Sequence, residues 1–507
     1  MHVHEPGKAY VVLALNTIAF TVCFACWMLN GVLVTFLIEN QVFAWSESQI
    51  GWLIGIPVLS GSLIRLPVGI LTDKFGGKYV FAGVMLLSAV PLFLLSYAST
   101  YAEFLVASLG FGLVGTSFAV GIAYTSVWFR REHQGTALGI FGAGNAGAAL
   151  TSMGAPRLLS WLTGAGENLD AWRQMPRIYA AALVIMTVIF VLFASPKKID
   201  DSHITSFAQR LAPLRHLRVW RFGLYYFLVF GGFVALAQWL IPYYVSVYLM
   251  PLATAGLLAS IFSLPSGVIR ALGGYLSDRH GARRVMYWVL ASCLICCALL
   301  IVPRMDIHSP GKGIIAKRSG VVSSVAPGEI IVGDMRYPVR ANGNVVLTEA
   351  QKTQDTLVLP TMSNWQEPIV QEGETVKKKQ LLARGITHIY FQANVWIFTA
   401  LVFVVGIMMG IGKAAVYKHI PDYFPKEVGV VGGIVGVLGG LGGFFCPIVF
   451  GYMLEWTGLW ITCWAFFAAL SAVCLWWMHS VIQQMMNKEA ASHAQRIEHM
   501  QHTTKVA

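Results

Sequence analysis

The sequence predicts an all-α polytopic membrane protein with 12 transmembrane helices in two six-helix repeats and a small β-rich extracytoplasmic insertion. Three observations lead to this prediction. Of the 507 residues, 56% are hydrophobic and only 12% are charged, whereas soluble globular proteins are about 25% charged. Twelve apolar runs are long enough to cross a bilayer, which takes about 20 residues. One motif also occurs twice, 205 residues apart, from Arg65 to Arg270.

A polar connection separates the apolar runs into two sets of six. The first set lies at 10–38, 49–71, 78–99, 104–128, 135–162 and 177–194, and the second at 222–250, 253–276, 284–303, 392–417, 428–452 and 458–480. We therefore expect an N-terminal six-helix bundle at 1–194, a cytoplasmic linker at 195–221, helices 7–9 of a C-terminal bundle at 222–303, a β-rich periplasmic insertion at 304–391, helices 10–12 at 392–482 and a cytoplasmic tail at 483–507.

Lysine and arginine in the short loops predict the orientation, because cytoplasmic loops carry an excess of them. They gather after the second, fourth and eighth runs and in the central connection, and examples are Lys74, Lys78, Arg130, Arg131, Arg279, Arg283, Arg284, Lys197 and Arg221. The loops 39–48 and 251–252 have none, although 157–177 has three arginines. Both termini are thus expected in the cytoplasm. The net charge of +12 is spread over these loops and indicates no nucleic-acid partner.

The repeated motif follows the second and the eighth run. Gly69-x-Leu-x-Asp73-Lys74-x-Gly76-x-Lys78 is matched by Gly274-x-Leu-x-Asp278-Arg279-x-Gly281-x-Arg283. These loops resemble the gating motif of the major facilitator superfamily, a class of transporters built from such repeats. An aspartate beside basic residues at a helix end can pair with the neighbouring bundle and hold one conformation. The resemblance therefore implies a gating role for Asp73, Lys74, Asp278 and Arg279.

Arg65 and Arg270 lie inside the membrane. Each precedes its motif aspartate by eight residues, which places it about 12 Å into the helix. A charge at such a depth is a functional-site hypothesis by default. The runs hold almost no carboxylates to balance the two guanidiniums, and guanidinium groups bind planar oxyanions through paired hydrogen bonds. The sequence thus predicts an anion site between the repeats and disfavours a neutral sugar or a cation.

Two glycine ladders occupy the fifth and the eleventh run. The first ladder reads Gly142-Ala-Gly144-Asn145-Ala-Gly147, and the second contains Gly439, Gly440 and Gly443. Close helix packing is the simplest interpretation, and it would also let gating helices slide. Asn145 differs because its amide can donate to a bound oxyanion. The ladders are offset by 294 residues instead of 205, so an insertion of 89 residues lies between runs eight and eleven.

These ladders, with the matched arginines, resemble the paired signature of the nitrate/nitrite porters (NarK/NasA type) of the major facilitator superfamily. The resemblance covers essentially all twelve runs. It implies alternating-access transport of nitrate and nitrite across a bacterial cytoplasmic (inner) membrane by a multi-pass protein. It also implies that two arginines hold the anion between aromatic rings, and the residues that match the family's substrate site are Arg65, Arg270, Asn145, Phe118, Tyr226 and Phe230.

Lys413 is a further cation within an apolar run. The offset of 294 makes it the counterpart of Ala119, next to Phe118, so it is expected near the same cavity. It either joins the anion site or titrates there. The alternative is a lysine that reaches the cytoplasmic interface.

The lack of central acids favours obligatory exchange, because closure of an empty site would desolvate two like charges without compensation. Proton-coupled nitrate symport, or transport of another small oxyanion, stays open, and an anion-binding membrane receptor is a remote alternative. No nucleophile–base pair or metal-ligand cluster is evident, so we expect no enzyme activity, no cofactor and no metal. The protein is expected to act as a monomer.

The insertion at 304–391 differs from the rest in its many charges and short Val/Ile runs. The segments 320–325, 329–333 and 343–347 are typical of short strands. Residues 368–383 resemble half of a biotinyl/lipoyl-type barrel, but the modified Met-Lys-Met hairpin is absent, so no prosthetic group is expected. The insertion either docks a periplasmic partner protein or is passive.

Overall fold

The computed structural model describes residues 6–197, 211–302, 305–340, 361–391, 394–424 and 428–504. The chain forms two compact units. The helical unit comprises Met1–Ile301 and Thr399–Ala507, and the β unit comprises Val302–Phe398.

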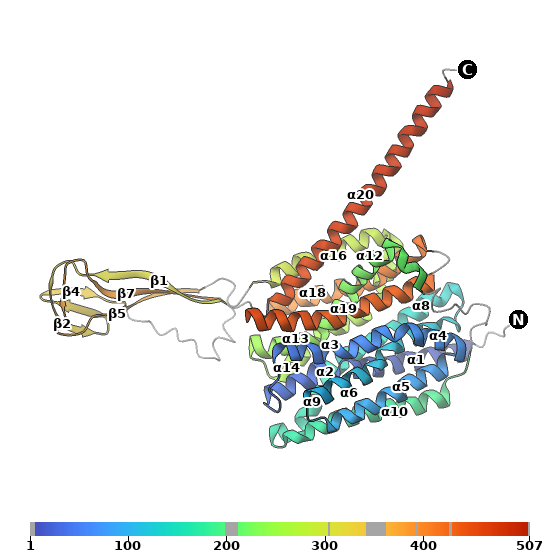
Figure 1. The fold of residues 1–507 in the computed structure, drawn as a ribbon, viewed down its shortest axis with the longest axis horizontal. Coiled ribbons are helices and arrows are strands. Elements are labelled where there is room, and N and C mark those ends of the chain that lie inside the picture. Colours follow the sequence, from blue (N-terminus) through green and yellow to red (C-terminus); the bar gives the residue numbers. More distant parts are fainter. Residues whose placement is uncertain are drawn as a thin grey trace. The chain divides into compact units, whose positions relative to one another are not determined.

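The first half of the helical unit contains the blue-to-teal helices of Figure 1. Its elements are α1 (Pro6–Trp27), α2 (Leu29–Glu39), α3 (Glu47–Leu63), α4 (Arg65–Phe75), α5 (Gly77–Leu94), η1 (Leu95–Tyr97), α6 (Tyr101–Phe111), η2 (Gly112–Thr116), α7 (Ser117–Ser126), α8 (Arg131–Gly142), η3 (Ala143–Ala146), α9 (Gly147–Leu162), η4 (Gly164–Gly166), η5 (Leu169–Arg173) and α10 (Gln174–Phe193).

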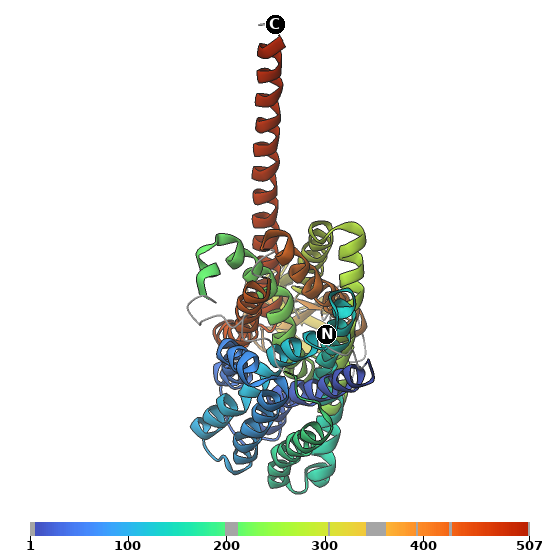
Figure 2. The ribbon, with the colours of Figure 1, turned by 90° about the vertical axis from the view of Figure 1, so that its right-hand side faces the viewer.

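The second half contains the green-to-red helices, which lie together on the other side of the bundle in both ribbon views (Figures 1 and 2). Its elements are η7 (Ala212–Arg215), α12 (Leu217–Tyr226), the π-helix η8 (Phe227–Gly231), α13 (Gly232–Tyr248), α14 (Leu252–Val268), α15 (Arg270–His280), α16 (Ala282–Leu300), α18 (Val395–Tyr423), α19 (Val428–Thr457) and α20 (Thr462–Thr504).

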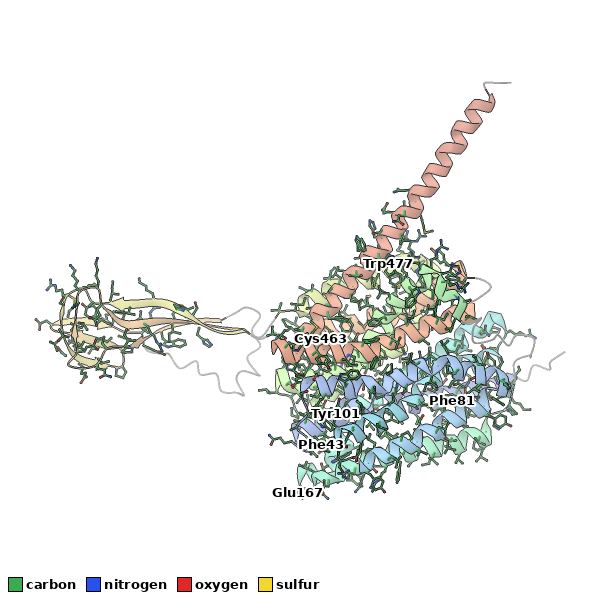
Figure 3. All side chains as sticks on the ribbon, viewed as in Figure 1. Phe43, Phe81, Tyr101, Glu167, Cys463 and Trp477 are labelled. Carbon is green, nitrogen blue, oxygen red and sulfur yellow. The ribbon has the colours of Figure 1, made fainter. Side chains whose placement is uncertain are left out.

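The expected helical membrane architecture is confirmed. Within the described ranges, nine helices are long and apolar enough to cross a membrane, and the count rises to 11 if each of two bent pairs is one span. The remaining run, 135–162, is also helical and consists of α8, η3 and α9. Side chains fill the space between these helices (Figure 3), where Phe81 and Cys463 are buried.

Each bent pair breaks immediately before one of the two predicted intramembrane arginines. Helices α3 and α4 meet at 40°, and α14 and α15 meet at 48°. Arg65 is the first residue of α4, and Arg270 is the first residue of α15. Pro67 explains the first break, because it has no N–H to donate to the carbonyl of Leu63. The bends therefore place the two arginines at equivalent positions in the two halves.

Helix α3 of the first half packs against α19 of the second half at backbone distance. A Cβ atom on Gly51 would lie 2.4 Å from the carbonyl oxygen of Pro447, and one on Gly55 would lie 2.6 Å from that of Phe444. The backbone N–H of Ser48 donates to Glu455 Oε2 at 3.1 Å. Glycine is thus required where these two helices close together, at the end of the bundle where α3 begins.

The β unit confirms the expected small β insertion. The seven strands among its described residues are β1 (Met305–Ile315), β2 (Gly320–Ala326), β3 (Glu329–Val332), β4 (Met335–Pro338), β5 (Thr361–Pro368), β6 (Thr375–Val376) and β7 (Leu381–Phe391). They form antiparallel sheets of order β1-β7-β5 and β4-β3-β2-β6. Buried apolar residues, among them Val322, Ile330 and Val376, form its core. The predicted strand at 343–347 lies outside the described residues.

Candidate functional site

Arg65 is buried at the break between α3 and α4, with 3% of its surface exposed. Its Nη1 donates to the carbonyl oxygen of Gly436 at 2.9 Å, and its Nη2 donates to that of Gly115 at 3.1 Å. Its Nε has no hydrogen-bond partner among the described residues. Because Gly436 belongs to the second half and Gly115 to the first, this one guanidinium joins the two halves.

Arg270 approaches the same place from the second half. Its guanidinium carbon lies 5.4 Å from the centre of the Phe118 ring, and that of Arg65 lies 5.7 Å from the same ring. Both distances are within the range of cation–π attraction. Nη1 of Arg270 is buried and has no hydrogen-bond partner in the described part of the chain. The structure thus brings the two predicted arginines together around one phenylalanine.

The predicted aromatic residues surround the two cations. Phe118 and Phe230 stack with ring centres 6.2 Å apart, and Phe230 stacks on Tyr226 with centres 5.0 Å apart. All three side chains are buried. Phe230 lies in the π-helix η8, and such π-bulges are frequent at functional sites. Tyr226 and Phe230 have nearly parallel rings, at 9° to each other.

Asn145 is fully buried, and neither atom of its amide has a hydrogen-bond partner among the described residues. It lies in η3, the break between α8 and α9. Gly267 of the second half packs against the backbone of this break, because a Cβ there would meet Ala146 N at 3.0 Å. Buried polar atoms without partners cost about 1–3 kcal/mol each, so this amide is suited to a ligand.

The site has an excess of positive charge. No aspartate or glutamate is fully buried among the residues that the structure describes. Neither Arg65 nor Arg270 forms an ion pair with any of them. Carbonyl oxygens and ring faces therefore stabilise the two cations, and these groups carry no net charge. This arrangement is suited to binding an anion. The planar guanidinium groups can donate paired hydrogen bonds to a flat oxyanion.

Lys413 on α18 is completely buried, so it does not reach an interface. Its Nζ donates to the carbonyl oxygen of Ser266 at 3.1 Å and lies 3.3 Å from the centre of the Phe233 ring. Ser266 is four residues before Arg270, so Lys413 lies one helical turn from the break that carries that arginine. A third cation thus lies close to the site, again without a buried acid in the described ranges.

Comparison with known proteins agrees with this geometry. The family model of the Major Facilitator Superfamily matches residues 15–324 and 381–500, which is most of the chain. The chain belongs to the major facilitator superfamily.

Relatives within this superfamily confirm the resemblance inferred from the ladders and arginines. A "Probable nitrate/nitrite antiporter NarK1" of Thermus thermophilus is 38% identical over 94% of this chain and 93% of its own length. A "Nitrite extrusion protein" of Bacillus subtilis is 25% identical and covers 97% of this chain and 98% of its own. Among solved structures, an inward-facing bacterial homologue of the human lysosomal transporter Spinster has a TM-score of 0.61 at 13% identity, with 94% of this chain and 97% of that chain covered. The structural likeness shows the fold alone.

Most glycines of the two ladders in this major facilitator protein allow close packing against neighbouring residues. Gly144 packs on Phe20, Gly147 on Thr21, Gly440 on Ser62 and Gly443 on Val234, each where a Cβ would come within 2.7 Å of another atom. Gly439 faces Tyr226, and its Cβ would lie 2.1 Å from Cδ1 of that ring. Gly142 is different, because its Cβ would meet Arg270 only at 3.5 Å. All of these ladder positions except Gly142 thus require glycine for packing.

The motif loops contain one ion pair that the structure describes. Asp278 pairs with Lys418 of α18 at 2.5 Å, and both side chains are about half exposed. This pair lies within the second half instead of joining the two bundles. Arg279 and Lys74 contact their own helices, through Tyr275 at 3.4 Å and the Phe75 ring at 5.4 Å. Asp73 occupies the equivalent position in the first half, at the end of α4.

Tyr417 lies beside the two arginines of the candidate site, a position that the sequence did not predict. Its ring meets Tyr226 edge-on at 5.0 Å and lies 5.4 Å from the guanidinium carbon of Arg270. Its hydroxyl donates to the carbonyl oxygen of Gly432 at 3.0 Å. The available signal was its spacing from Lys413, because residues i and i+4 share a helix face.

Proposed function

We propose that the protein exchanges nitrate for nitrite across a bacterial cytoplasmic membrane by alternating access. The names of its relatives, a probable nitrate/nitrite antiporter and a nitrite extrusion protein, support these substrates. The observation that carries the site assignment is the pair of guanidiniums around Phe118, together with the unpartnered amide of Asn145. The anion lies between Arg65 and Arg270, its flat face against the aromatic rings, and Asn145 donates to one of its oxygens.

The charge balance favours exchange over one-way transport. Closing an empty site would hold two arginines in a low dielectric with no acid to compensate them. A monovalent anion lowers that cost, so the loaded carrier changes conformation more readily than the empty one. Gly142 and Gly440 contact Arg270 and Ser62 of the other half and would let the two halves move past each other. Gly144, Gly147, Gly439 and Gly443 would serve gating through close packing chiefly within their own halves. The motif residues at 73–74 and 278–279 stabilise one end state.

The basic loops favour a cytoplasmic position for the motif end of the bundle and for both termini. The β unit then lies on the extracytoplasmic side, where it either docks a partner protein or is passive. The protein acts as a monomer, because the proposed site is complete within one chain.

Exchange can be distinguished from proton symport in proteoliposomes. Vesicles loaded with nitrite are expected to take up labelled nitrate rapidly, whereas vesicles without an internal anion take up almost none, with or without a pH gradient that is acidic outside. The rate is measured as initial uptake under each condition. Steady uptake into empty vesicles, driven by the imposed pH gradient, would contradict exchange and favour the symporter.

Lys413 is proposed to strengthen the positive potential at the site. Lys413→Met removes the charge while keeping much of the volume, so we expect a several-fold higher KM for nitrate. Lys413→Arg keeps the charge and is the matched control. Both variants are compared by counterflow at several nitrate concentrations. An unchanged KM in Lys413→Met would remove this lysine from the site.

A further inference from the structure

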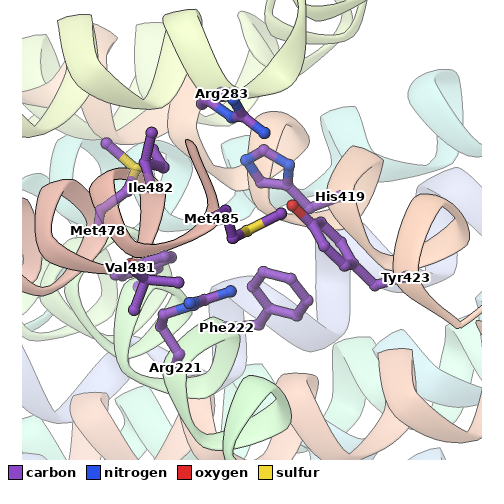
Figure 4. A pocket seen from close by; sticks show the side chains of 10 residues that line it. Arg221, Phe222, Arg283, His419, Tyr423, Met478, Val481, Ile482 and Met485 are labelled. Carbon is purple, nitrogen blue, oxygen red and sulfur yellow. The ribbon is translucent and has the colours of Figure 1, made fainter. Parts of the chain in front are cut away.

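A second cationic pocket lies at the motif end of the second half. Four helices of that half line it, namely α12, α16, α18 and α20 (Figure 4). No residue of the proposed nitrate site belongs to this lining. The pocket is therefore separate from the proposed nitrate site.

Arg221 is the most informative residue of the pocket. Only 8% of its surface is exposed, although it lies in the second turn of α12. Its guanidinium carbon lies 5.6 Å from the ring of Phe222, and it forms no hydrogen bond or ion pair with any residue that the structure describes. Most of the Arg221 side chain is thus buried, and no described acid balances its charge, so a bound anion would stabilise it.

Other groups in the lining suit the same anion. Arg283 lies across the pocket from Arg221 (Figure 4). His419 is buried between them and stacks on Phe222 at 5.8 Å, with the two rings 5° from parallel. The nearest acid on α18 is Asp422, which is exposed and is not part of the lining. The two arginines thus face the pocket from opposite sides, and its lining contains no acid.

The part of the lining that α20 contributes is apolar. It consists of Met478, Val481, Ile482 and Met485. Their spacing of three, four and seven residues places them on one face of this helix. A small inorganic anion would use only the two arginines. A ligand with a phosphate and a hydrocarbon chain would use both the arginines and this apolar face.

We propose that this pocket binds an anionic phospholipid, with its phosphate at Arg221 and Arg283 and its acyl chain along α20. Arginine binds phosphate through paired, charge-assisted hydrogen bonds. The lipid would contact α12 and α18, the helices that carry Tyr226 and Tyr417. It would thereby support one side of the nitrate site, and in this respect the inference rests on the proposed function.

Thermal unfolding of the full-length purified protein tests this proposal. Phosphatidylglycerol is titrated into protein held in phosphatidylcholine nanodiscs, and the shift in unfolding temperature gives an apparent affinity. We expect a saturable upward shift for the wild type. The double variant Arg221→Gln/Arg283→Gln should bind at least about tenfold more weakly, because each arginine contributes a charge-assisted contact. Arg284→Gln, one residue beyond the pocket lining, is the matched control and should keep the wild-type affinity.

Two further arms make the result decisive. Inorganic phosphate is titrated into the same nanodiscs, and an equal stabilisation by phosphate alone would overturn the assignment to a lipid. Arg221→Lys/Arg283→Lys keeps both charges and should retain part of the shift even if the glutamine pair folds poorly. Wild-type affinity for phosphatidylglycerol in the glutamine pair, or equal loss in Arg284→Gln, would overturn the proposal. This binding assay needs no transport, so its outcome is independent of whether nitrate is exchanged.

Discussion

Arg65→Lys and Arg270→Lys are each expected to reduce nitrate counterflow by about 10- to 100-fold. Lysine keeps the charge but cannot make the paired hydrogen bonds of a guanidinium, and a hydrogen bond to a charged group is worth about 1.5–3 kcal/mol. The loss should be larger for Arg65, since a single ammonium cannot easily replace its bonds to both Gly436 and Gly115.

The measurement is initial uptake of labelled nitrate into nitrite-loaded proteoliposomes. Arg157→Lys is the matched control, because Arg157 is exposed and donates to Met153 O of its own helix, at 3.5 Å. Nitrate-dependent thermal stabilisation, measured on the same preparations, reports binding separately from turnover. Full activity in both site variants would refute an anion site between these residues.

Gly439→Ala is expected to abolish most transport although it adds a single methyl group. The new Cβ would lie 2.1 Å from Cδ1 of Tyr226. The tyrosine is fully buried and stacked on Phe230, so its ring cannot move without disturbing the proposed aromatic wall. Overpacking of this kind costs about 1–3 kcal/mol, and we expect at least about a tenfold lower rate.

Gly433→Ala is the control on the same helix. Its Cβ would meet only Leu66 Cδ2, at 3.8 Å, and alanine favours the helix by up to about 1 kcal/mol. Counterflow and thermal unfolding are measured for both variants. Equal counterflow in Gly439→Ala and Gly433→Ala would show that the Tyr226 ring does not need its observed position.

Composition and repetition are sufficient to predict the fold class. Long apolar runs indicate helices that cross a bilayer. The repeated motif around Asp73 and Asp278 aligns the two halves from the sequence alone. The same alignment places Arg65 and Arg270 at equivalent depths, and the bent helix pairs give this equivalence a structural basis. Pro67, which causes the first bend, is visible in the sequence, but the angle and direction of the bend are not.

Contacts between distant residues could not be predicted in the same way. Tyr417 meets Tyr226 across 191 positions, and each residue alone is an ordinary buried aromatic. The irregular segments η2, η3 and η8 have no distinct sequence period, although η3 and η8 contain Asn145 and Phe230. The phospholipid pocket was also invisible, because Arg221 and Arg283 were both interpreted as orientation charges in loops.

The lack of a buried acid around the two arginines, among the described residues, has a consequence for energetics across the membrane. Ring faces and carbonyl oxygens neither add nor remove net charge, so the moving site differs between its two half-cycles only in the anion that it carries. Nitrate and nitrite each carry one negative charge, so the proposed exchange moves no net charge per cycle. A membrane potential, which contributes about 2.3 kcal/mol per charge for each 100 mV, would then neither drive nor oppose it. The concentration gradients of the two anions alone would set the direction of transport.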